Sequence, residues 1–112
     1  MNPSTLDYQW KNGVRSLYHR TCAYASGKGS KEGDKDKDGQ IYRFSCHHLN
    51  SYQVFPEQRY LIDNGVFLRW DVHNDFHLKY GFKAVDEHQF AHYCQLYYQI
   101  NWFQVKKSEP SR

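Results

Sequence analysis

The chain has 112 residues and a formal net charge of +3 at pH 7; 39% of its residues are hydrophobic and 18% are aromatic. Disordered chains are poor in aromatic residues, so this composition excludes a disordered protein and predicts a single globular domain over residues 1–112. Three cysteines without a C-x-x-C spacing argue against a disulfide framework. The sequence also shows no signal peptide and no apolar membrane span. Together these features predict a cytoplasmic protein that does not enter a membrane.

The first predicted element surrounds the dipeptide Asn12-Gly13. Asn-Gly is typical of a tight hairpin turn, because both turn positions take positive φ values. The same stretch also fits an amphipathic helix, in which a central glycine would cost roughly 1 kcal/mol relative to alanine. We therefore favour a hairpin and keep the helix as the alternative. The helix would bury one apolar stripe: Leu6, Trp10, Val14, Leu17 and Tyr18.

The segment that follows is expected to be extended over residues 21–26. Residues 27–39 contain glycine, serine, lysine and aspartate but no apolar side chain, which predicts a flexible charged loop. Residues 41–46 alternate between apolar and polar side chains, as one strand of a half-buried sheet does.

A second hairpin is predicted at Asn64-Gly65. Residues 60–62 lead into this turn and residues 66–70 lead out of it, and both stretches are rich in apolar side chains. Residues 76–82 then alternate again, with Phe76, Leu78, Tyr80 and Phe82 on one face, which predicts another strand.

The pattern changes to a helical period after Asp86, which is a favourable N-cap residue. A helix is expected over residues 86–102, and the polar tail 106–112 is expected to fray. Together these elements predict an α+β fold. Its antiparallel sheet has about five to six strands, and the C-terminal helix packs on one face of the sheet.

One calcium candidate lies in the charged loop. Asp34, Asp36 and Asp38, followed by Gly39, match the beginning of an EF-hand calcium loop. Ser45 occupies the position of the bidentate glutamate, so any Ca²⁺ affinity would be weak, and we favour a solvated loop. No other cofactor is expected.

The seven histidines include two pairs with a spacing of four residues, His73/His77 and His88/His92, and the adjacent pair His47-His48. A zinc site needs about four such ligands to converge. Nothing in the linear spacing requires this convergence, so we interpret the histidines as polar surface and interface residues.

The far side of the predicted C-terminal helix lacks charge, and depletion of charge is typical of interface cores. We therefore expect a small non-enzymatic module that binds a protein partner or a second copy of itself. Such a module could be an accessory or inhibitor protein of a phage or mobile element. The contact residues are expected to be His88, His92, Gln95, Gln99, Trp102 and Trp70.

Two alternatives stay open. Aromatic rings among cations can bind single-stranded nucleic acid, RNA in particular, by stacking and by phosphate contact. The residues for this alternative are Arg15, Tyr18, Arg20, Tyr24, Lys28, Lys31, Tyr42 and Arg43. The second alternative is a metal-free ribonuclease that uses histidine as its general acid and base. No catalytic motif supports it, so an enzyme is the less favoured reading.

Overall fold

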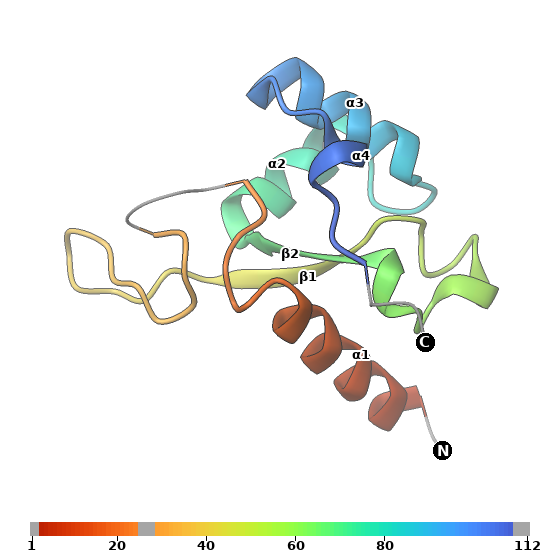
Figure 1. The fold of residues 1–112 in the computed structure, drawn as a ribbon, viewed down its shortest axis with the longest axis horizontal. Coiled ribbons are helices and arrows are strands. Elements are labelled where there is room, and N and C mark those ends of the chain that lie inside the picture. The colour runs from red at the N-terminus through yellow and green to blue at the C-terminus, as the bar shows by residue number, and fades with distance from the viewer. Residues whose placement is uncertain (1–2, 25–28, 109–112) are drawn as a thin grey trace.

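The structure is a computed structural model, and it describes residues 3–24 and 29–108. Within these residues the chain forms a two-stranded antiparallel sheet with helices on both sides (Figure 1). Helix α1 (Pro3–Leu17) lies against one face of the sheet. Helices α2 (Trp70–Tyr80), α3 (Glu87–Tyr98) and α4 (Trp102–Val105) lie on the other side.

The sheet pairs β1 (Phe44–His48) with β2 (Gly65–Arg69), and Phe44 lies opposite Arg69. Side chains alternate across a strand, so neighbouring residues of β1 face different layers. The His48 ring stacks on Trp10 of α1, whereas the His47 ring contacts Phe76 of α2. The segment between the strands contains the short 3₁₀ helices η1 (Pro56–Gln58) and η2 (Ile62–Asn64).

The N-terminal segment is a helix, so the favoured hairpin at Asn12-Gly13 is wrong and the alternative is correct. Trp10, Val14 and Tyr18 recur every four residues, and all three are buried against the sheet side. The Trp10 indole also donates a hydrogen bond to the Leu61 carbonyl at 2.8 Å. Burial of this stripe outweighs the cost of one glycine inside a helix.

The predicted sheet of five to six strands is wrong, because the described residues contain only β1 and β2; the broader α+β description holds. Asn64-Gly65 does not form a tight turn. Instead, β2 begins at Gly65 and pairs with β1 across the intervening segment 49–64. Residues 76–82 are not a strand, since α2 runs through Tyr80 and leaves Leu78 and Phe82 exposed. The alternation there does not correspond to a buried face.

The predicted C-terminal helix is present but shorter. Asp86 is the N-cap of α3, as predicted, and the structure adds a capping box with Gln89. The helix ends at Tyr98, its C-cap residue Gln99 adopts a left-handed conformation with φ 53°, and α4 begins separately at Trp102. None of the helices among the described residues is long and apolar enough to cross a membrane.

The predicted loop and tail are only partly described. Residues 25–28 and 109–112 lie outside the described residues. The beginning of the tail is attached to the body of the protein, because Lys106 forms an ion pair with Glu87 at 2.7 Å. The backbone N–H of Lys107 also donates to the Tyr18 hydroxyl at 3.3 Å.

Gly65 provides a test of the packing between β2 and α1. A Cβ atom at this position would lie 2.3 Å from Cγ2 of Val14 and 2.8 Å from the Trp10 ring, both of which are buried. We expect Gly65→Ala to lower the free energy of unfolding by about 1–3 kcal/mol, because an overpacked core must shift. Urea-induced unfolding measures the change.

Gly13→Ala is the matched control. Its new methyl group would meet only the flexible end of the Ile62 side chain, and it gains helix propensity of about 1 kcal/mol. We therefore expect a much smaller loss, or a gain, of stability. Equal losses in the two variants would contradict this account of the α1–β2 packing.

Candidate metal centre

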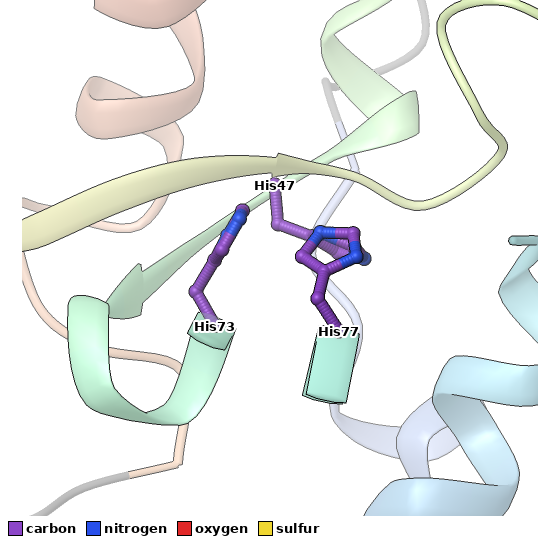
Figure 2. A group of neighbouring side chains, drawn as sticks. All are labelled: His47, His73 and His77. Atoms are coloured by element: carbon purple, nitrogen blue, oxygen red, sulfur yellow. The ribbon is translucent and has the colours of Figure 1, made fainter. Parts of the chain in front are cut away.

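Three histidines from two elements converge on one point between the sheet and α2. His47 projects from β1, while His73 and His77 lie one turn apart on α2, and the three rings point toward one another (Figure 2). One ring nitrogen from each residue lies within 4.8 Å of the other two. Within the part of the chain that the structure describes, this is the only such group of three or more histidine, cysteine or carboxylate side chains.

Two of the three rings have a buried nitrogen without a hydrogen-bond partner among the described residues: Nε2 of His47 and Nδ1 of His73. The His47 side chain is only 1% exposed. A buried polar atom without a partner costs about 1–3 kcal/mol, so such atoms call for an explanation. Coordination of a metal ion would satisfy both lone pairs.

The third ring is already oriented by a backbone contact. Nδ1 of His77 lies 2.7 Å from the Gly81 carbonyl, which can only accept a hydrogen bond, so this nitrogen carries the proton. The Nε2 lone pair of His77 is therefore free in a neutral ring. Histidine ligands of metals are commonly fixed in this way, with the other nitrogen donating to a carbonyl or carboxylate. Phe82 stacks on the same ring at a centroid distance of 5.0 Å.

The electrostatics of the site favour neutral rings for His47 and His73. Burial lowers the pKa of His47 well below its ordinary value, and the neighbouring rings of His73 and His77 lower it further. Burial is also the main cause that lowers the pKa of His73 to about 4. Neutral imidazole is the form that binds metal ions, so at neutral pH His47 and His73 need not lose a proton first.

The cluster borders a surface pocket of about 240 Å³. Ser51, Tyr52 and Gln53 line the pocket beside the histidines, and no carboxylate or thiolate of the described residues joins the three histidines as a fourth ligand. Cys46 also borders the pocket, but its Sγ lies 3.5 Å from the Lys11 carbonyl of α1. Three nitrogen ligands with one open position resemble catalytic zinc sites more than closed structural sites.

A fourth histidine, His48, lines the same pocket without joining the cluster. Its Nε2 lies 2.9 Å from the Arg59 carbonyl and must donate, so Nδ1 of the neutral ring is left as an acceptor. The ring stacks on Trp10 at a centroid distance of 3.8 Å. Burial lowers the pKa of His48. Because Trp10 belongs to α1, the His48 ring lies on the other side of the sheet from the His47 ring.

The buried side chain of Asn64 holds the segment that contains Arg59, the hydrogen-bond partner of His48. Its Nδ2 donates to the carbonyls of Asn50 and Gln58, and its Oδ1 accepts from the backbone N–H of Asn50. Arg59, whose carbonyl binds His48, follows Gln58 directly. Sequence reasoning read Asn64 as a turn residue and missed this role.

Two of the aspartates of the calcium candidate accept hydrogen bonds from the backbone of their own loop. Asp34 accepts hydrogen bonds from the backbone N–H groups of Gly29 and Lys31. Asp36 accepts from those of Asp38 and Gln40. The oxygens of Asp34, Asp36 and Asp38 do not form a cluster of the kind that the three histidines form.

The residues expected to contact a protein partner differ in their exposure. His88, His92, Gln95 and Gln99 are exposed on α3. Trp102 is 1% exposed and donates a hydrogen bond to Glu87, so it belongs to the core. Trp70 is exposed but begins a different helix, α2. Contact with a partner through α3 stays a prediction.

The tyrosines expected to bind nucleic acid are largely engaged within the protein. Tyr18 is buried, and the ring of Tyr24 stacks between Phe90 and Tyr98 while its hydroxyl contacts Cys94. Tyr42 lies beneath the Arg69 guanidinium.

The cations expected in the same surface are spread over several places. Arg15 and Arg20 pair with Glu32, whereas Lys31 is exposed and Arg43 lies over Trp70. Lys28 lies outside the described residues. Of these residues, Arg43 is nearest in sequence to His47, the member of the histidine cluster that lies on β1.

The sequence signal for the cluster was present but was read in separate parts. His47 precedes the pair His73/His77, whose spacing of four residues places both on one helical face. The strand predicted over residues 76–82 hid that relation. Comparison of the chain with protein-family models, with curated proteins and with solved structures found no match.

The lowered pKa values predict how stability depends on pH in the metal-free protein. Between the ordinary histidine pKa of 6.5 and the folded value of about 4 for His73, the unfolded chain binds more protons than the folded one. We therefore expect the free energy of unfolding to fall as the pH falls from about 6.5 to about 4. Each such histidine contributes up to about 1.4 kcal/mol per pH unit.

Urea unfolding at a series of pH values, with a chelator present, measures this slope. His73→Gln should flatten it, because one of the responsible groups is removed. The exposed His88→Gln is the control and should leave it unchanged. A slope that His73→Gln does not alter would contradict the buried neutral state of His73.

Proposed function

We propose that the protein binds a divalent transition-metal ion through His47, His73 and His77 and hydrolyses phosphodiester bonds of nucleic acid at that ion. The observation that carries the proposal is the convergence of three imidazole nitrogens within 4.8 Å of one another at a pocket. The sequence alone favoured a non-enzymatic binding module; the grouping of these side chains supports an enzyme instead.

The ligand chemistry narrows the choice of ion. Imidazole suits zinc, copper, nickel and iron, whereas calcium and magnesium prefer oxygen ligands. Zn²⁺ also accepts a tetrahedral geometry with three protein ligands and one exchangeable position. A Zn²⁺-class ion is therefore the best match for His47, His73 and His77.

Charge supports an anionic substrate. Three neutral imidazoles leave the full charge of a divalent cation uncompensated, and the pocket lining contains no carboxylate. The chain as a whole carries a net charge of +3. A phosphate oxygen supplies both the hard negative charge that completes such a site and a group for the ion to polarise.

A metal ion held by His47, His73 and His77 would supply the chemistry of this reaction: it would lower the pKa of a bound water and stabilise the negative charge that develops on the phosphate. His48 is not placed to act as the base, because its ring stacks on Trp10 of α1, on the other side of the sheet from the His47 ring.

Metal binding can be tested separately from activity. We expect the metal-free protein to bind one equivalent of Zn²⁺ or Co²⁺ and to become more stable by about 2.7 kcal/mol when free ion is at 100 times its dissociation constant. Calorimetry and the visible spectrum of the Co²⁺ form measure binding. His73→Ala should lose it.

The double variant His88→Gln/His92→Gln is the control, because its spacing of four residues on α3 matches that of His73 and His77 on α2. It should bind metal like the parent protein. Metal binding that survives His73→Ala, or that disappears in the control, would contradict the proposed ligand set.

Cleavage of nucleic acid is the test of the reaction. We expect the Zn²⁺, Co²⁺ or Ni²⁺ form to cleave plasmid DNA or RNA and a chelator to stop it. His73→Ala should abolish cleavage together with metal binding, because it removes one ligand of the ion.

The exposed His88→Ala serves as the control for the cleavage assay and should keep full activity. A metal-loaded protein without cleavage of any nucleic acid would overturn the proposed reaction but not the metal site. Cleavage by His73→Ala at the rate of the parent protein would show that the activity does not depend on an ion at this site.

A further inference from the structure

Two cation–π pairs lie at the corner where β2 leads into α2. Arg43 precedes β1, and its guanidinium carbon lies 5.0 Å from the centroid of the Trp70 ring. In the neighbouring pair, the guanidinium carbon of Arg69 lies 5.1 Å from the Tyr42 ring. The backbone N–H of Trp70 also donates to the Arg43 carbonyl at 2.7 Å, which fixes the two residues relative to each other.

Only one of the two pairs is available to a ligand. The Arg69 guanidinium donates two hydrogen bonds to Asp71, at 2.7 and 2.9 Å, and the Tyr42 ring is half-buried near Gly29. Arg43 is exposed, and no carboxylate of the described residues lies within ion-pair distance of it. The Trp70 side chain is 38% exposed.

The available pair is adjacent to the histidine cluster. Trp70 precedes His73 by three residues and His77 by seven, and these positions share one face of a helix. A chain of nucleotides bound with one phosphate at the cluster would therefore pass close to Trp70. Indole and guanidinium groups are the side chains that single-stranded nucleic acids contact most favourably, through stacking and phosphate contact.

We infer that Trp70 and Arg43 form a nucleotide-binding site beside the metal centre, in which the indole stacks on an unpaired base and the guanidinium binds a neighbouring phosphate. This inference rests on the proposed function and names its substrate: nucleic acid that is single-stranded or locally unpaired. The bases of a duplex stack on one another and offer no free face, so they cannot stack on Trp70 without leaving the duplex.

Tryptophan fluorescence tests this site without any cleavage, using the full protein with a chelator present. Trp10 and Trp102 are each 1% exposed, so quenching by a bound base reports on Trp70. We expect a short single-stranded oligothymidylate to quench the fluorescence and its affinity to fall steeply with salt. A duplex of the same length should quench much less. Equal quenching by the two would overturn the inference.

Variants of Trp70 and Arg43 separate the contribution of base stacking to the affinity from the contribution of the guanidinium charge. Trp70→Ala should raise the dissociation constant of a labelled single strand about 5- to 100-fold, whereas Trp70→Phe should keep most of the affinity because it retains a ring. Arg43→Gln should reduce the slope of log affinity against log salt by about one phosphate contact. Leu78→Ala, an exposed apolar residue of the same helix, is the matched control and should bind like the parent protein.

The outcomes distinguish this site from the proposed function. Circular dichroism and thermal unfolding verify that each variant is folded. If Trp70→Ala binds single strands as the parent does, or if only a protein partner quenches Trp70, the inference fails while metal-dependent cleavage can stand. If Trp70 is quenched and its variants lose affinity but no metal ion supports cleavage, the nucleotide site stands and the proposed reaction fails.

Discussion

The antiparallel pairing of β1 with β2 is the constraint on which the rest of the molecule depends. Its register places His47 opposite Val66, and the alternation of side chains sends His47 toward α2 and His48 toward α1. A slip of one residue would exchange these directions, leaving His47 against Trp10 and His48 beside Phe76. Burial of Trp10 and Val14 beneath the strands opposes such a slip.

The helix that follows β2 without a loop completes the arrangement. Because α2 begins at Trp70, directly after Arg69, its direction is set by the end of the sheet. Phe76 is fully buried between His47 and Phe90, and this packing brings the helical face of His73 and His77 to the sheet. The same packing that forms the core therefore also creates the polar cluster.

Buried imidazoles without hydrogen-bond partners are costly in a core of this size. The nitrogens of His47 and His73 forgo hydrogen bonds to water on folding, and burial keeps both rings neutral. A bound cation would offset this cost, so metal binding and folding would be thermodynamically linked.

Hydrogen bonds hold the segment 49–64 in place. The amide of Asn64 donates one of them. The Arg59 side chain donates another to the Tyr52 carbonyl at 2.7 Å and lies over the Tyr52 ring. Rigidity there keeps the contact from the Arg59 carbonyl to His48 in place.

The sequence by itself determined the features that depend on neighbouring residues. The capping box of Asp86 and the helical period after it located α3, and the aromatic content predicted a folded domain. Local patterns misled where long-range packing outweighed them. Asn12-Gly13 lies within α1 because the stripe of Trp10 is buried, and the alternating Phe76 and Leu78 belong to α2.

Only the tertiary structure decided that His47 joins His73 and His77. Their convergence needs both the register of β1 and the helical state of α2, and neither is set by residues close in the chain. The same holds for Asn64, whose turn-like sequence gave no sign of the carbonyls of Asn50 and Gln58 that its side chain binds. Hydrogen bonds and capping act between neighbouring residues and can be read locally, whereas a site assembled by burial depends on the packing of the whole chain.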